Sequence, residues 1–305
     1  MNSETKTHSA SSVQVCQNCH KDFVIEPDDF AFYEKIKVPP PTFCSDCRTM
    51  RRLTYRNERS LYRRKCNLCD KAIFSVYPPE SSYIAYCLDC WPSDKWDALD
   101  YGLEYDWNKP LFKQWQELYN RVPQRNLQIT NLTNSQWGGN AIRDCTRIHM
   151  SYSIIKSEDV LYSKDVDKSR MIMDSFDVVE SENVFQNIFG YKNYNCFWVY
   201  NSRGCLDSYF LYDCANCQNC FLCTNLRNKK YCIRNKAYSK EEYFNKISIG
   251  DIGDYAALQS YIREFSELIS SSIHKYAEII NCVSCSGNEL VNCKNSHVCF
   301  SGHDL

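Results

Sequence analysis

Residues 183–230 read NVFQNIFGYKNY, NCFWVYNSRGCL, DSYFLYDCANCQ and NCFLCTNLRNKK, which are four consecutive blocks of twelve residues. Similar residue types recur at the same place in each block, as in the column Val184, Cys196, Ser208, Cys220 and its neighbour Phe185, Phe197, Tyr209, Phe221. The register extends back to about residue 145 and forward to Ala237 without an insertion. An uninterrupted repeat of this kind is typical of a quasi-one-dimensional array.

The twelve-residue period predicts a parallel β-solenoid over residues 141–237. Twelve residues are too few for a helix-pair repeat or a propeller blade, but they fit a short strand and a turn. Asn and Asp recur in two columns, one with Asp159, Asn183 and Asp207 and another with Asp165 and Asp177. Both residue types tolerate the left-handed backbone region that glycine usually provides. One coil could contain one unit or two, and the bulky Phe/Tyr column favours the wider coil of two units.

Eight cysteines lie within the repeat, and two interpretations of them are open. The run Cys214, Cys217, Cys220, Cys223 superficially resembles an iron–sulfur ligand string. Each of these cysteines also replaces a small residue of its own repeat column, and buried free cysteine behaves as a small hydrophobe. We favour the second interpretation, in which the thiols belong to the core.

The first hundred residues contain two sets of paired Cys-x-x-Cys motifs. The first set is Cys16, Cys19, Cys44 and Cys47, and the second is Cys66, Cys69, Cys87 and Cys90. Two residues between thiolates let both sulfurs reach one ion, and two such pairs complete a tetrahedron. Four thiolates leave no coordination position for water or substrate. The spacing therefore predicts two structural zinc ions, in a ribbon over residues 14–63 and another over residues 64–98.

These motifs resemble the bacterial probable zinc-ribbon domain. The resemblance is carried by the two cysteine pairs of the first set, by Phe23, by the stretch Phe30-Ala-Phe-Tyr33, by Pro39-Pro40-Pro41 and by Arg48. The continuation through Arg56-Asn-Glu-Arg59 and Asp94-Lys-Trp-Asp97 is similar to long zinc-ribbon proteins with Cys/Asn-rich repeats from candidate-phyla bacteria. His20 stands where that family usually has Gly. The resemblance implies the architecture and the zinc ligands, but it implies no activity.

A basic segment separates the two cysteine sets. Residues 48–65 carry eight basic side chains and one acid, Glu58. As a helix, this segment would place five arginines on one face, namely Arg48, Arg52, Arg56, Arg59 and Arg63. Arginine is suited to phosphate recognition, so this face is a candidate nucleic-acid-binding surface. The alternative is a solvated face or one that is paired internally, since acidic residues follow at 89–106.

The remaining segments are expected to be a disordered N-terminus, two regions that contain helices, and a final return of the repeat. Residues 1–13 read as disordered, and residues 99–140 as an aromatic connector with a helix after Pro110 whose Trp and Tyr residues are mostly core. Over residues 238–281 a capping box at Ser239 and an apolar stripe from Leu258 to Ile280 predict helices that cap the array or dock a partner. Residues 282–305 are expected to resume the repeat incompletely. Cys282, Cys285, Cys293, His297 and Cys299 offer a third metal site as the alternative.

Composition and motifs exclude several classes of function. The 36 basic and 37 acidic residues nearly cancel, so the chain is not a globally basic nucleic-acid protein. No run approaches the length of a membrane span and no secretory signal is visible, so the twenty cysteines indicate a reducing, cytoplasmic setting. No nucleophile elbow, P-loop or dinucleotide motif occurs. We therefore predict a mainly β, non-enzymatic zinc-binding scaffold without a small-molecule substrate. Its partner would be a nucleic acid, a ribonucleoprotein or a protein along the solenoid, and a Cys-rich metal or redox protein is a weaker alternative.

Overall fold

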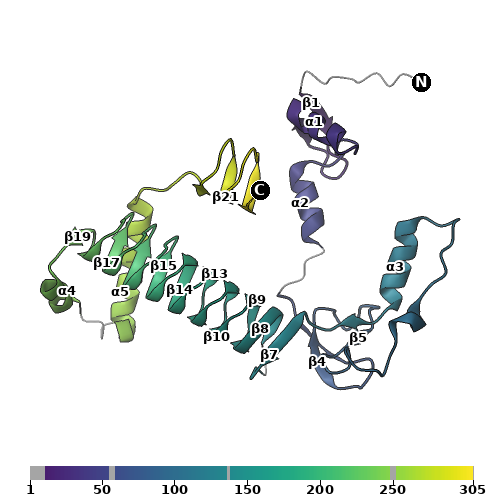
Figure 1. Cartoon of the computed structure of the whole chain (residues 1–305), viewed down its shortest axis with the longest axis horizontal. Coiled ribbons are helices and arrows are strands. Elements are labelled where there is room, and N and C mark those ends of the chain that lie inside the picture. The colour runs from purple at the N-terminus through teal and green to yellow at the C-terminus, as the bar shows by residue number, and fades with distance from the viewer. Residues whose placement is uncertain (1–10, 55–58, 136–137, 248–251, 305) are drawn as a thin grey trace. The chain divides into compact units, whose positions relative to one another are not determined.

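The computed structural model describes residues 11–54, 59–135, 138–247 and 252–304. The chain is mainly β and divides into two compact units, Met1–Asn126 and Leu127–Leu305. Figure 1 shows their elements. The boundary lies inside the segment that the sequence assigned to a connector.

The first unit begins with two small modules of similar construction. In the first, β1 (Ser12–Val15) pairs antiparallel with β2 (Asp22–Ile25), and α1 (Pro27–Lys35) and α2 (Ser45–Leu53) follow. In the second, β3 (Tyr62–Lys65) pairs antiparallel with β4 (Ala72–Ser75). Strand β5 (Ala85–Tyr86) then pairs in parallel with β6 (Gln124–Arg125), which ties the end of the connector to the second module.

The predicted helix over residues 48–65 is wrong. Helix α2 ends at Leu53, and Tyr62–Lys65 form strand β3. The antiparallel pairing of β3 with β4 positions the first cysteine pair of the second module, and an extended backbone is required there. The arginine spacing of 4, 4, 3 and 4 therefore does not describe one helical face.

The connector contains η1 (Ala98–Tyr101) and α3 (Leu111–Arg121), and Pro110 precedes α3 as predicted. Trp96 packs edge-on against Tyr86 and against Trp91, so these aromatic residues belong to the core of the second module. The expectation that most connector aromatics are core is wrong for Trp107 and Trp115, which are 89% and 64% exposed. Helix α3 has no buried residue.

The second unit contains the repeat sheet, which we define as strands β7 to β19. Its strands are β7 (Ile129–Thr133), β8 (Gly139–His149), β9 (Ser151–Ile155), β10 (Glu158–Leu161), β11 (Lys164–Asp167), β12 (Arg170–Met173), β13 (Phe176–Val179), β14 (Glu182–Tyr191), β15 (Tyr194–Tyr200), β16 (Leu206–Tyr212), β17 (Gln218–Thr224), β18 (Lys230–Ile233) and β19 (Lys236–Ala237). From β8 to β18 the paired residues are twelve apart and the strands are parallel, as in Val160↔Ile172 and Phe197↔Tyr209. The sequence repeat is thus the register of the sheet.

Hydrogen bonds close seven of these strands into a ring. The order is β12-β10-β8-β9-β11-β13-β14, and β14 pairs back to β12. The long strand β8 pairs with β9 through residues 139–143 and with β10 through residues 146–149, and β14 likewise pairs with both β12 and β13. The sheet therefore closes on itself, like a barrel, where the long strands turn a corner.

A three-residue period lies inside the twelve-residue one. From Ala141 to Arg234 every third residue has a positive φ, and none of these residues is β-branched. As far as Leu222, the residue after each of them points inward, as for Ile148, Val160 and Ile172, which are at most 2% exposed. Branching at Cβ is strongly disfavoured in the left-handed region, which explains its exclusion from these positions. The predicted left-handed role of the Asn and Asp columns is confirmed, but Phe189 and Trp198 adopt the same conformation.

Buried serines connect successive repeats. The hydroxyl of Ser163 donates to the carbonyl oxygen of Leu161 at 2.8 Å and accepts the N–H of Ser175 at 3.1 Å. Ser169 makes the same two bonds with Asp167 and Ser181. Each inward serine thus satisfies a buried backbone N–H of the next repeat, and an unsatisfied N–H there would be costly.

The expectation of a wide coil of two units is wrong. Pairing at an offset of twelve means that each repeat stacks directly on the next. The inward column contains only small and medium side chains, such as Cys196, Ser208 and Cys220, while the bulky column containing Phe185 and Phe197 faces outward. The large side chains therefore need a cover rather than a wide interior.

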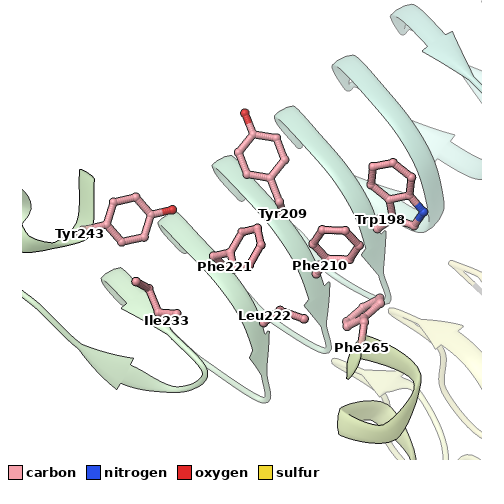
Figure 2. Packing of buried hydrophobic residues seen from close by; sticks show 8 residues of the cluster. All are labelled: Trp198, Tyr209, Phe210, Phe221, Leu222, Ile233, Tyr243 and Phe265. Atoms are coloured by element: carbon pink, nitrogen blue, oxygen red, sulfur yellow. The ribbon is translucent and has the colours of Figure 1, made fainter. Parts of the chain in front are cut away.

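Helix α5 (Tyr255–Ser271) provides that cover over β16 and β17. Figure 2 shows its Phe265 directed at Phe210 and Leu222, and the rings of Phe265 and Phe210 lie 5.7 Å apart, edge to face. All three side chains are at most 2% exposed. The predicted apolar stripe is confirmed as far as Ile269, but the helix ends at Ser271 instead of continuing to Ile280. Ser270 and Ser271 hydrogen-bond carbonyl oxygens four residues back, and Ser272 is extended.

The predicted capping box begins α4 (Lys240–Lys246), where Ser239 and Glu242 bond each other's backbone. Strand β19 pairs antiparallel with β18, and Tyr243 of α4, 2% exposed, packs beside Ile233. These elements cover the last strand of the repeat sheet, whereas α5 lies on its outer face. The chain then forms a second, three-stranded parallel sheet from β20 (Ile279–Ile280), β21 (Gly287–Val291) and β22 (Cys299–His303).

Candidate metal centres

The four cysteines of each predicted set come together. Within each set the four Sγ atoms all lie within 4.8 Å of one another. Among the residues that the structure describes, no other group of His, Cys, Asp or Glu is this compact. Each set could therefore hold a metal ion.

The first centre is assembled from a turn and a helix start. Cys16 and Cys19 lie in the turn between β1 and β2, whereas Cys44 is the N-cap of α2 and Cys47 is in its first turn. The Sγ atoms of Cys19 and Cys44 are 3.8 Å apart, and the backbone N–H of Cys44 donates to the Sγ of Cys16 at 3.3 Å. The amide of Asn18 donates to the Sγ of Cys47 at 3.3 Å. N–H donors directed at sulfur favour the thiolate form that a metal requires.

The second centre repeats this arrangement. The Sγ atoms of Cys69 and Cys87 are also 3.8 Å apart, and the N–H of Cys87 donates to the Sγ of Cys66 at 3.3 Å. The backbone agrees as well, since Gln17 donates to Thr42 and Asn67 to Ala85, two residues before the third cysteine in both cases. The two cysteine sets therefore share the same local structure as well as the same kind of spacing.

One backbone position explains a departure from the resembling family. His20 and Asp70, each directly after the second cysteine of its set, have φ of 57°. Their N–H groups donate to the carbonyls of Cys16 and Cys66, respectively, both at 3.0 Å. This is a left-handed position where glycine is the usual residue. Histidine and aspartate adopt it more readily than most side chains do, so the ligand geometry is kept.

The hydrogen bonds make the thiols of each centre unequal. Burial raises the pKa of Cys16, but the N–H groups of Cys19, Cys44 and Asn18 outweigh it and lower that pKa to about 6. Cys66 shows the same balance, with a pKa of about 7. Burial and neighbouring thiols raise the pKa of Cys90 to about 12. The hydrogen bonds to the first cysteine of each set therefore favour the thiolate form that metal binding requires.

The described candidate nucleic-acid arginines lie on different elements. Arg48 donates to the hydroxyl of Tyr33 at 3.1 Å, and Arg52 donates to Thr49 at 2.8 Å, both near or within α2. Arg63 lies on β3 with its guanidinium 5.6 Å from the centre of the Phe74 ring. Arg59 precedes β3, and Arg56 lies outside the described residues. Arg64, which was not among the candidates, donates to the carbonyls of Pro78 and Tyr83 and so supports the second module.

The repeat cysteines occupy the inward positions of the repeat sheet. Cys214, Cys217, Cys220 and Cys223 are at most 1% exposed, and each thiol donates to the carbonyl two residues before it, as the serines do. Cys145 even accepts the N–H of Ser157, as an inward serine would. Cys282, Cys285, Cys293 and Cys299 donate in the same pattern. The three-residue period, visible in the alternating Ser and Val/Ile of residues 148–184, was the sequence signal for these positions.

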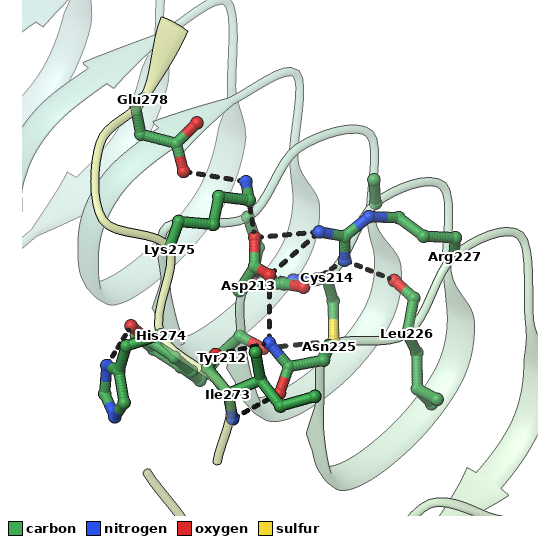
Figure 3. A network of polar contacts seen from close by, with 12 residues as sticks. Tyr212, Asp213, Cys214, Asn225, Leu226, Arg227, Ile273, His274, Lys275 and Glu278 are labelled. Carbon is green, nitrogen blue, oxygen red and sulfur yellow. Dashed lines mark hydrogen bonds and ion pairs between the residues drawn. The ribbon is translucent and has the colours of Figure 1, made fainter. Parts of the chain in front are cut away.

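A network centred on Asp213 joins the segment after α5 to the repeat sheet (Figure 3). The carboxylate accepts from Arg227 at 2.8 Å, from Lys275 at 2.9 Å and from the amide of Asn225 at 2.9 Å. Burial raises the pKa of Asp213, but these partners outweigh it and lower the pKa overall. Asp213 belongs to the same repeat column as Asp165 and Asp177, and its ion pair with Lys275 joins residues that are distant in sequence.

None of the helices within the described ranges is both long and apolar enough to cross a membrane. The two four-cysteine centres are compatible with zinc-ribbon-like modules. No family model, no curated protein and no solved structure matches this chain, so the resemblance to a bacterial family receives no support from comparison.

Proposed function

We propose that this chain is a non-enzymatic zinc-binding scaffold, with two zinc-ribbon or treble-clef modules followed by a β-solenoid that presents a surface to a partner. The observation that carries the proposal is the duplicated centre, with its matching Sγ distances of 3.8 Å. A tetrahedral zinc ion with Zn–S bonds of about 2.3 Å places its sulfurs about 3.8 Å apart. Both sets fit zinc in this respect.

A structural role follows from the donor sets. Four thiolates occupy all four positions of a tetrahedral ion, so water and substrate have no place on it. The twenty cysteines form no disulfide, which supports a reducing compartment such as the cytoplasm. The register of twelve supports the solenoid, because identical positions of successive repeats stack directly.

Metal stoichiometry tests the zinc proposal. Native mass spectrometry of the intact chain should find two zinc ions, and a variant carrying Cys16→Ser and Cys19→Ser should retain one. A chain without zinc contradicts the proposal. Four or more metal ions would instead favour the Cys-rich storage or redox alternative.

The nature of the partner forms a second part of the proposal. Arg51 and Arg52 are exposed on α2, which supports contact with nucleic-acid phosphates. Arg48 and Arg63 are engaged by Tyr33 and Phe74, which supports a protein-interaction module instead. Fluorescence anisotropy with a labelled RNA at several salt concentrations separates the two, because phosphate contacts weaken steeply with salt.

Charge reversal gives the sharper comparison. Arg51→Glu with Arg52→Glu should weaken RNA binding at least tenfold if α2 contacts phosphates. The matched control is Lys35→Glu with Lys37→Glu, which changes the charge equally elsewhere in the same module. Equal binding by both variants would exclude α2 as a nucleic-acid surface.

A further inference from the structure

The second cysteine of each centre is the ligand that solvent reaches. Cys16, Cys44 and Cys47 are at most 9% exposed, and Cys66, Cys87 and Cys90 are at most 5% exposed. Cys19 and Cys69, in contrast, are accessible. The same position is open in both modules, so the feature belongs to their shared construction.

Hydrogen bonding reinforces this difference among the ligands. Cys66 accepts the N–H groups of Leu68 and Cys87, and Cys87 accepts the N–H of Cys90. Donors to sulfur withdraw charge and so make a thiolate less nucleophilic. A buried, hydrogen-bonded sulfur is also hard for a reagent to reach.

We propose that Cys19 and Cys69 are the oxidation sites of the two centres, at which the bound thiolate attacks a peroxide and the metal is released. The inference rests on the proposed zinc function. Accessible thiolates are the cysteines that peroxides oxidise first.

Two cysteines of one centre supply the two electrons that the peroxide takes up. A lone pair of the Cys69 sulfur attacks one peroxide oxygen, the O–O bond breaks, hydroxide leaves, and the sulfur becomes a sulfenic acid. The Cys87 thiolate, whose Sγ lies 3.8 Å away, then displaces hydroxide and forms a disulfide. The two sulfurs lose two electrons and the peroxide gains them. A zinc ion held by this set would lose two of its four thiolate ligands and would be released. Cys19 and Cys44 have the same separation.

Two cysteines of the repeat, Cys145 and Cys196, provide an internal comparison. Burial raises the pKa of Cys196 to about 12, and it also raises the pKa of Cys145. These groups are protonated, buried thiols at neutral pH. They should remain reduced while the centres react.

The test treats the zinc-loaded chain with hydrogen peroxide, follows zinc with a colorimetric chelator, and maps disulfides by mass spectrometry. The expected first products are disulfides containing Cys19 or Cys69, formed as two zinc ions are released. Cys69→His keeps a four-ligand set but removes the accessible thiol, so this variant should release one zinc ion instead of two. Cys90→His, which alters a buried ligand of the same centre, is the matched control and should release two.

The outcomes separate this inference from the zinc proposal. Native mass spectrometry of each variant before treatment establishes that both ions are bound. If two zinc ions are present but the first disulfides lack Cys19 and Cys69, or if Cys69→His releases as much zinc as Cys90→His, the inference is wrong and the zinc proposal stands. If no zinc is bound at the start, the zinc proposal itself fails.

Discussion

Asn187 and Gly190 show how one repeat departs from the others at the level of single residues. The preceding repeat has Ser175 and Val178 at these inward positions, and the following repeat has Val199 and Ser202. Asn187 is fully buried, and its amide nitrogen and oxygen have no hydrogen-bond partner in the described structure. A Cβ at Gly190 would lie 2.3 Å from the Oδ1 of Asn187. The larger polar side chain thus fills the space that the glycine leaves.

Because the Asn187 side chain occupies the space beside Gly190, the effects of substitutions at these two positions on stability should not be additive. Gly190→Val alone should destabilise the protein by roughly 1–3 kcal/mol through overpacking. Asn187→Ser alone should be close to neutral, because it removes an unpaired amide but leaves a void. Together they restore the neighbouring repeat and should stabilise by about 1–3 kcal/mol. Denaturant unfolding of the four proteins checks this double-mutant cycle, and additive effects would contradict the packing described.

The hydrogen bonds of the inward serines explain why serine and cysteine can replace each other at inward positions of the repeat. Both side chains donate to the carbonyl two residues before them and accept the N–H of the next repeat, as Ser163 and Cys145 do. A residue such as alanine would fit the volume but would leave that N–H unsatisfied. The cysteine content of the repeat is therefore a consequence of hydrogen bonding and size.

The contact between the segment after α5 and the repeat sheet shows how one ion-pair network joins two elements. Asp213 has only 10% of its side chain exposed, while Arg227 and Lys275 are about two-fifths exposed. Solvent weakens the contribution of exposed charges, so the Lys275 ion pair stabilises the attachment modestly, by about 1 kcal/mol, while Arg227 contacts the carboxylate from within the repeat. The carboxylate is the shared group on which the network depends.

The lowered pKa of Asp213 predicts a loss of stability in acid. Because its folded pKa lies below the unfolded value of about 4, the ion pairs contribute fully above that value and are lost as the pH falls through the folded pKa. Asp213→Asn should destabilise the protein by about 1–2 kcal/mol at pH 7 and by less at pH 3, which lies below the unfolded pKa, because part of the carboxylate's contribution is already lost there. Denaturant unfolding at both pH values measures the difference. A pH-independent difference would show that the charge is not responsible.

At the level of the whole molecule the two units depend on different sources of stability. The buried clusters of the first unit consist largely of the cysteine ligands, with few apolar side chains beside them. The second unit buries continuous columns of aliphatic side chains and the aromatic cluster under α5. A small core needs a metal to remain folded, whereas a large one does not.

Chelation should therefore unfold one unit and spare the other. After removal of metal at neutral pH, limited proteolysis should degrade residues 1–126 and leave a resistant fragment that starts near Leu127. Readdition of zinc should restore protection. A first unit that resists protease without metal would contradict the dependence on the cysteine centres.

The metal centres could be predicted because their ligands are paired over two residues and the pairing occurs twice. The repeat register could be predicted because each column preserves size and polarity every twelve residues. The helical face over residues 48–65 could not, because β3 is extended through its pairing with β4, and the arginine spacing alone contains no sign of that partner. The exposure of Trp107 and Trp115 was also not visible, since aromatic composition does not show what covers a ring.

The sequence by itself determined the two four-cysteine sets, the twelve-residue register and the use of Asn and Asp in left-handed turns, because each is a local requirement on residue type at a fixed spacing. Only the tertiary structure decided that the large side chains face outward under α5, that Asp213 meets Lys275, and that Cys19 and Cys69 are the accessible ligands. These features depend on contacts between segments distant in sequence. Spacing along the chain does not specify such contacts.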